Sequence, residues 1–169
     1  MAIDLTLKGT AITNREASPR VLNNPGLGEG AIVKTAIGYL LSVPAALSAT
    51  SVIRLVSVPS NGIVTDVRFT SGAQAAGALD IGVYRTNADG GAVVDADFFA
   101  SAVAVTAASL NVDVLNESTV FTVAKQSQPL WQAAGMTSDP KAQLDLALTI
   151  TTDITTGLQP VQLRASYVQ

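Results

Sequence analysis

Alternating apolar and polar residues predict β-strands along the second half of the chain. Between residues 144 and 151, Leu and Ile at the even positions alternate with Asp, Ala and Thr at the odd positions. This period of two places the aliphatic side chains on one face of a strand. Residues 161–167 repeat the pattern. Because a loop of Thr, Gly and Pro separates the two runs, we expect them to pair as antiparallel strands. One sheet face should bury four side chains together: Leu144, Leu146, Leu148 and Ile150.

Further strands are predicted upstream. Residues 52–58 and 63–70 are separated by a turn that contains Asn61-Gly62, and this pair is typical of a β-hairpin because both residues tolerate positive φ. Residues 79–83 alternate in the same way and end at a turn spanning 87–91. Residues 33–41 and 119–124 carry a weaker strand pattern.

Two short segments predict helical turns instead. Residues 97–102 begin with Asp97, which can cap a helix N-terminus, and continue with helix-forming residues. Residues 129–135 have proline at the start and glycine at the end, which is the expected order for a short helix. About seven short strands with little helix predict an all-β domain over residues 35–169, an antiparallel β-sandwich of jelly-roll type.

Residues 1–34 predict an extended N-terminal arm. The segment 9–30 shows neither the helical nor the strand period, and prolines and glycines at positions 19, 25, 26, 28 and 30 interrupt it. Ordering one residue costs roughly 1–2 kcal/mol of backbone entropy, so an arm of this length needs contacts with a packed neighbour. Such contacts would come from six residues: Ile12, Arg15, Glu16, Arg20, Val21 and Leu22. The charged ones are suited to charge-assisted hydrogen bonds and the aliphatic ones to shallow apolar pockets.

Composition favours a protein that contacts other subunits. The 169 residues include only 14% charged and 48% hydrophobic residues, and the net charge is −3. A soluble monomer normally carries more charge on its surface, so much of this surface should be buried in contacts. Without a run of Lys or Arg, nucleic-acid binding is not expected. The longest apolar stretch, residues 39–47, is too short to span a bilayer and contains Pro44, so no membrane association is expected.

Candidate catalytic and metal-binding chemistry is sparse. The chain has neither cysteine nor histidine, which removes the commonest general base and metal ligand, so an enzyme is not expected. Asp89, Asp95 and Asp97 form the densest carboxylate group and could offer oxygen ligands to calcium. Counted from Asn87, however, this segment lacks the Gly and Glu of an EF-hand loop. The expected roles are a turn acid and a helix cap, with no metal and no cofactor.

Two other functional interpretations concern a catalytic acid pair formed by Asp66 and Asp80 and a sugar-binding role for the single tryptophan, Trp131. The two acids lie in separate predicted strands, where outward carboxylates are normally solvated. An exposed Trp131 beside a groove would favour sugar binding, whereas a packed Trp131 would anchor its short helix in the core or an interface. Gly26, Gly28 and Gly30 are assigned to arm flexibility, because no strand precedes them and no helix follows.

Several longer stretches resemble small structural proteins of tailed-bacteriophage heads. These stretches are residues 14–22, 55–61, 80–84, 90–101 and 129–140. The resemblance implies a capsid decoration, or cement, protein: a β-sandwich or jelly roll, usually trimeric, that sits on the outer shell where major capsid proteins meet. It implies that the protein is made in the cytoplasm of a bacterial host and acts on the outer surface of the virion.

The sequence thus favours a non-enzymatic virion protein that binds the assembled capsid lattice, with the major capsid protein as partner and a homotrimer as its oligomeric state. Two alternatives remain open. A carbohydrate-binding or adhesive β-sandwich would share the fold. A glycan hydrolase would need two carboxylates facing each other about 5–10 Å apart in a cleft.

Overall fold

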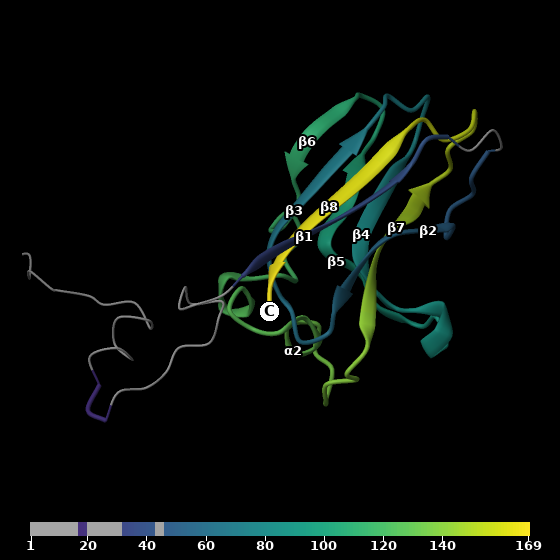
Figure 1. Ribbon diagram of the computed structural model, residues 1–169. Helices are drawn as coiled ribbons and strands as arrows, with labels where there is room; N and C mark the ends of the chain where they lie inside the picture. Colours follow the sequence, from purple (N-terminus) through teal and green to yellow (C-terminus); the bar gives the residue numbers. More distant parts are fainter. Residues whose placement is uncertain (1–16, 20–31, 43–45) are drawn as a thin grey trace, which may run out of the picture.

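The fold is an antiparallel β-sandwich, as predicted. A computed structural model describes residues 17–19, 32–42 and 46–169. Eight strands form two four-stranded sheets that pack face to face (Figure 1). The strands are β1 Val33–Leu40, β2 Val52–Pro59, β3 Ile63–Ser71, β4 Ala78–Arg85, β5 Val93–Ala104, β6 Ser109–Asp113, β7 Gln143–Thr152 and β8 Val161–Val168. Helical structure in the described residues is limited to α2 Leu130–Ala133 and two 3₁₀ turns, Asn87–Asp89 and Val123–Lys125.

The strand order is that of a jelly roll. One sheet has the order β1-β8-β3-β6 and the other β2-β7-β4-β5. The first strand therefore pairs with the last, the second with the seventh, the third with the sixth and the fourth with the fifth. The chain behaves as a long antiparallel ribbon folded across itself, so that each half of the ribbon contributes to both sheets.

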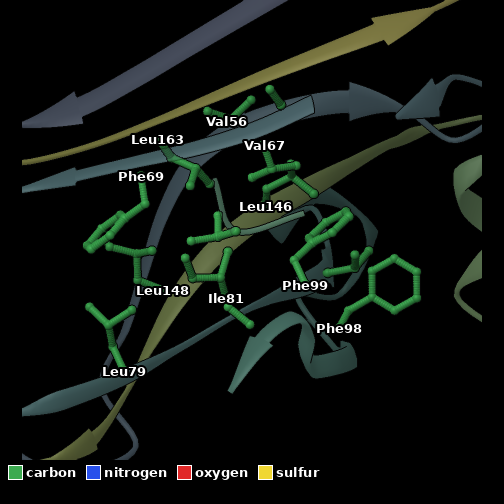
Figure 2. Packing of buried hydrophobic residues seen from close by; sticks show 14 of the residues in the cluster. Val56, Val67, Phe69, Leu79, Ile81, Phe98, Phe99, Leu146, Leu148 and Leu163 are labelled. Atoms are coloured by element: carbon green, nitrogen blue, oxygen red, sulfur yellow. The ribbon is translucent and has the colours of Figure 1, made fainter. Parts of the chain in front are cut away.

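The inner faces of the two sheets form one hydrophobic core (Figure 2). Strand β7 confirms the clearest strand prediction, because its four even-numbered aliphatic side chains are all buried. Two of them, Leu146 and Leu148, point into the core toward the sheet that holds Phe69 and Leu163 (Figure 2). Three aromatic rings close one part of the core, with centroids about 5 Å apart: Phe98, Phe99 and Phe121.

Both predicted hairpins are wrong, although their strands are present. Strands β7 and β8 lie in different sheets, and so do β2 and β3. At the turn between β2 and β3, the Gly62 amide donates a hydrogen bond to the Pro59 carbonyl at 2.9 Å. Neither Asn61 nor Gly62, however, adopts the positive φ of a tight hairpin turn. These turns carry the chain from one sheet to the other, a crossing that the folded ribbon requires.

The helical turn predicted at residues 97–102 is also wrong, because this segment belongs to strand β5. The ladder between β4 and β5 pairs Ile81 with Ala100 but Val83 with Asp95, so β5 contains extra residues at this point. In a regular strand, consecutive side chains point to opposite faces. The bulge allows both Phe98 and Phe99 to be buried.

The weak strand predicted at residues 119–124 does not form, whereas the strand at 33–41 does, as β1. The segment before the turn at Val123 is irregular, and it places Phe121 in the core. Ser118 ties this segment to β5, with its hydroxyl donating to the Phe98 carbonyl at 2.7 Å and its amide to the Phe99 carbonyl at 2.8 Å. The helix predicted after Pro129 is confirmed as α2.

Candidate interaction surfaces

The six arm residues predicted to contact a partner lie outside the described residues. These are Ile12, Arg15, Glu16, Arg20, Val21 and Leu22. Their roles stay predictions. The described part of the chain carries its own candidate surfaces, which lie on the outer faces and edges of the two sheets.

Strand β1 carries the most prominent of them. It is an edge strand, and its odd-numbered side chains share the outer face with Gln162, Arg164 and Ser166 of β8. Four large apolar side chains at odd positions along this strand and just beyond it keep between 59% and 68% of their surface exposed, and we call them the β1 row: Val33, Ile37, Tyr39 and Leu41. An isolated exposed apolar residue needs no explanation, but four on the same face of one strand indicate a contact surface.

A shallow hollow continues the β1 row at the C-terminal end of β1. It has a volume of about 280 Å³ and is lined mainly by apolar atoms of Tyr39, Leu41 and Pro160. At the opposite edge of the same sheet, β6 exposes Leu110 at 78% and Val112 at 44%. Both edges of this sheet therefore present apolar side chains to solvent.

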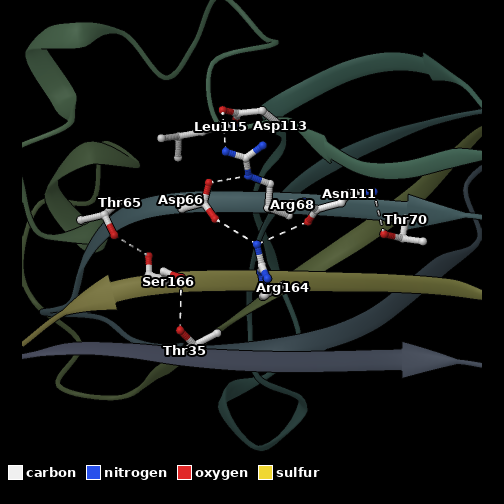
Figure 3. Close-up of polar contacts among 10 residues, drawn as sticks. All are labelled: Thr35, Thr65, Asp66, Arg68, Thr70, Asn111, Asp113, Leu115, Arg164 and Ser166. Carbon is white, nitrogen blue, oxygen red and sulfur yellow. Dashed lines mark hydrogen bonds and ion pairs between the residues drawn. The ribbon is translucent and has the colours of Figure 1, made fainter.

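Between these edges, the outer face is polar and its charges are paired (Figure 3). Asp66 accepts a hydrogen bond from Nε of Arg68 at 2.7 Å and lies 3.8 Å from Arg164. Arg68 also reaches Asp113 at 3.4 Å, and Arg164 donates to the Asn111 side chain at 3.3 Å. This network joins β3, β6 and β8. Its two arginines and two aspartates balance, so this face offers no excess charge to a partner.

The outer face of the other sheet is held by a partly buried ion pair. Nη1 of Arg54 donates to the Asp145 carboxylate at 3.0 Å and to the Arg85 carbonyl at 2.6 Å, while Nη2 donates to the Gly91 carbonyl at 2.7 Å. Ser57 donates to the second oxygen of Asp145 at 2.6 Å. The guanidinium also lies 5.2 Å from the centre of the Tyr84 ring. One arginine thereby joins β2, β7 and the β4–β5 turn.

Two further hollows open on the surface. One, of about 450 Å³, lies on the outer face of this second sheet and is lined by mostly apolar atoms of Val52, Tyr84 and Val93, among others. The other, of about 470 Å³, is lined by both polar and apolar atoms and lies beside the β2–β3 turn, next to Ser60 and Asp139. A hydrogen bond from the Ser60 hydroxyl, followed by one from the Lys141 amide, lowers the pKa of Asp139.

The carboxylates that suggested calcium do not converge. Asp89 forms an ion pair with Arg85 at 2.7 Å, and the Asp97 amide donates to the Asp95 side chain at 3.3 Å. Burial, a hydrogen bond with Asp97 and the charge of Asp97 raise the pKa of Asp95, while the Asp97 amide and Lys125 partly oppose that rise. Across the described residues, no three potential metal ligands come together. Asp66 and Asp80 lie on strands of different sheets and form no acid pair.

Trp131 does not anchor its helix in the core. Leu130 and Ala133 are the buried residues of α2, whereas Trp131 is half-buried and absent from the core cluster. Its ring lines none of the three hollows described above. The backbone of α2 is fixed by two bonds, from the Leu130 amide to Gly62 at 2.8 Å and from the Trp131 amide to Ser60 at 3.0 Å.

Comparison with known proteins gives one structural similarity. No family model matches the chain, and no curated protein matches it. Among solved structures, the fold is similar to a chain described as "Cyanophage Pam1 capsid asymmetric unit", with a TM-score of 0.48 and 16% sequence identity over 90% of this chain and 96% of that chain. In the described residues, none of the helices is long and apolar enough to cross a membrane.

Proposed function

We propose that this protein is a structural component of a bacteriophage head, a decoration protein that binds the assembled capsid. The observation that carries the proposal is the exposure of apolar side chains at both edges of one sheet, the β1 row on one side and Leu110 with Val112 on the other. A protein that occupies a lattice needs more than one contact surface, since it meets several neighbours at once. The resemblance of five sequence stretches to phage head proteins supports the same assignment.

In the proposed mechanism, binding of the protein to the assembled shell shifts the equilibrium between free capsid subunits and the shell toward the shell. A protein that binds the assembled lattice, but not free capsid subunits, stabilises the assembled state by RT ln(1 + [L]/Kd), which is about 2.7 kcal/mol when its concentration is a hundred times the Kd. This requires a rigid contact surface. The jelly roll provides one, because its core is continuous across both sheets and Arg54 joins β2, β7 and the β4–β5 turn.

The arm is the proposed clamp on the major capsid protein. Arg15, Glu16 and Arg20 would form charge-assisted hydrogen bonds with it, and Ile12, Val21 and Leu22 would enter apolar pockets. The β-sandwich would supply the contacts of a homotrimer through its weakly charged faces. The complete assembly would lie on the outer surface of the virion.

The proposed role is non-enzymatic and needs no cofactor. In the described residues several of the acids are paired with arginines, and no three potential metal ligands come together. The carbohydrate-binding alternative rests on Trp131 as an exposed ring beside a groove. Trp131 does not fit that role, because it is half-buried and lines none of the three hollows.

The test is binding to heads of the phage that encodes the chain, assembled without this protein. We expect saturable binding to assembled heads and no binding to the unassembled major capsid protein at the same concentration. Decorated heads should also resist heat or chelator treatment better than bare heads. Binding to neither form, or equal binding to both, would refute the proposed mechanism. Sedimentation of the free protein at micromolar concentration checks the trimer, and a pure monomer would count against it.

A further inference from the structure

Strand β1 leaves one complete edge open. Within the described residues, its strand partner is β8 alone, and the register between the two is regular over all eight residue pairs. Natural proteins protect such edges with prolines, bulges or charges. The sequence of β1 contains no proline, and its single charged residue is Lys34, near one end. An eight-residue apolar edge without these features is a template for pairing with another strand.

A partner of β1 can reach only its free edge and its outer face. The inner face is closed at Gly38, where a Cβ atom would collide with the backbone carbonyl of Leu55 in β2. Ala36 and Leu40, on the same inner face, are partly buried against the core. Strand β1 is therefore held in place from within, and the β1 row on the outer face stays exposed.

On the outer face of β1, apolar and β-branched residues are placed symmetrically about Ile37. Alternate residues read Val33, Thr35, Ile37, Tyr39 and Leu41. If two β1 strands lie antiparallel with Ile37 opposite itself, each Val33 faces the Leu41 of the other copy and each Thr35 faces Tyr39. Apolar or β-branched residues directly opposite each other are the pairs that stabilise an antiparallel ladder. We propose that β1 pairs with β1 of a second copy of this chain, across a twofold axis that passes through Ile37.

Charge and the exposed apolar side chains agree with this occupant. In that register each Lys34 lies opposite Leu40, so the two lysines sit at opposite ends of the ladder and no like charges face each other. Val33, Ile37, Tyr39 and Leu41 are 59–68% exposed. Contacts between opposite side chains across the ladder would bury part of this apolar surface.

Such a contact is isologous, since the same surface is used by both copies. It therefore differs from the contacts that would build a trimer and would join copies that belong to two neighbouring trimers. It also requires no capsid, so it can be tested on the free protein whatever the outcome of the capsid-binding test.

The absence of cysteine allows a direct test by cross-linking the full chain. Directly opposite residues in an antiparallel pair have Cβ atoms about 4.5–5.5 Å apart. The variant Ile37→Cys should therefore form a covalent dimer with a short bis-maleimide, seen on a denaturing gel. The matched control is Val123→Cys, a more exposed position at 82% in the 3₁₀ turn Val123–Lys125, outside β1. We expect at least tenfold more dimer from Ile37→Cys, and equal yields would overturn the proposal.

The register is tested by mixing two variants of different mass, Val33→Cys and Leu41→Cys. The proposed register predicts that the mixed dimer exceeds either self-linked dimer. A second variant, Ile37→Lys, places two lysines opposite each other and should halve the sedimenting mass of the wild-type particle without changing its circular dichroism. Unchanged mass would contradict the pairing.

Other occupants of the β1 row give different results. If the arm of the same chain covered the row, Ile37→Cys would cross-link only after removal of residues 1–31. If the capsid covered it, Ile37→Lys would lose capsid binding while the free wild-type chain showed no self-association. Either result would overturn the twofold contact.

Discussion

Arg54 links three segments of the sheet formed by β2, β7, β4 and β5. Its guanidinium donates to Asp145 and to the carbonyls of Arg85 and Gly91, so one side chain joins segments separated by up to 91 positions in sequence. The pair is largely shielded from water, with 22% and 12% of the two side chains exposed. Removing one partner from such a pair leaves an uncompensated charge, which costs much more than the net contribution of the intact pair.

We therefore predict that Arg54→Met lowers the free energy of unfolding by about 3 kcal/mol, because Asp145 then keeps only the Ser57 hydroxyl as a hydrogen-bond donor. Urea unfolding followed by circular dichroism measures the change. The matched control is Arg85→Ala, which breaks the exposed pair with Asp89 and should cost less than 1 kcal/mol. Similar losses from both variants would show that Arg54 is an ordinary surface arginine.

Gly82 lies where the backbone of β5 closely approaches that of β4, which leaves no room for a side chain. A Cβ atom at this position would collide with the backbone carbonyls of Asp95 and Ala96, because the β5 bulge lies directly against β4 here. We predict that Gly82→Ala costs about 3 kcal/mol or more, since backbone atoms cannot move aside as a flexible side chain can.

Gly90→Ala is the control for Gly82→Ala. Nothing lies within 4 Å of its added methyl group, so its cost should be limited to about 1 kcal/mol from the left-handed φ of 82°. Unfolding curves of the two variants distinguish crowding from backbone strain. A smaller loss for Gly82→Ala than for Gly90→Ala would mean that β5 can shift away from β4.

At the scale of elements, strict alternation identified strands but did not identify their partners. Residues 144–151 were predictable because four aliphatic residues in period two have only one way to be buried together. The two hairpins were wrong because a turn signal such as Asn61-Gly62 reports local reversal, whereas the choice of sheet depends on pairing with distant strands. The run Asp97 to Ala102 resembled a helix start, since a bulge that buries two consecutive phenylalanines breaks the period of two.

The candidate surfaces were less predictable than the strands. The apolar alternation of β1 was visible in the sequence, but its exposure depends on β1 being an edge strand, which only the topology reveals. The ion pair of Arg54 with Asp145 joins residues 91 positions apart and leaves no local signal. The arm residues, in contrast, were proposed from sequence alone and lie outside the described residues.

The raised pKa of Asp95, on strand β5, predicts how the stability of the fold depends on pH. The pKa of Asp95 is raised, chiefly by burial, so the folded state binds this proton more tightly than the unfolded state does. Stability then falls as the pH rises through the raised pKa, and the ionised Asp95 destabilises the fold at neutral pH. The Asp95→Asn variant keeps a side-chain oxygen that can accept the hydrogen bond from the Asp97 amide. We expect it to raise the urea midpoint at pH 7 and to lose this advantage as the pH falls through the pKa of Asp95.

Asp89→Asn serves as the control for Asp95→Asn, because Asp89 is an exposed acid that pairs with Arg85 and should not gain stability when neutralised. Measuring both variants from pH 7 down to acidic pH separates a local effect at β5 from a general effect of net charge. A midpoint for Asp95→Asn that stays at or below the wild-type value at pH 7 would contradict the expected direction.

For the whole molecule, the arm and the sandwich should be separable. In the part of the chain that the structure describes, all eight strands begin at or after Val33, and the core cluster with the residues packed against it begins at Ala36. A chain that starts at Ile32 keeps these strands and this core, and we expect it to unfold at the same temperature as the full chain. Its low surface charge and exposed apolar edges would remain, so any loss of capsid binding would come from the arm.

We predict that this shortened chain binds heads far more weakly than the full chain does. The double variant Arg15→Ala with Arg20→Ala should weaken binding by a smaller amount, about 1–3 kcal/mol for each arginine that is paired and desolvated in the complex. The measurement is the number of bound copies per head as a function of concentration. Arg85→Ala is the control, because it removes one positive charge, half of what the double variant removes, from the exposed surface of the sandwich. Wild-type affinity of the shortened chain would exclude the clamp and leave the edges of the sandwich as the attachment surface.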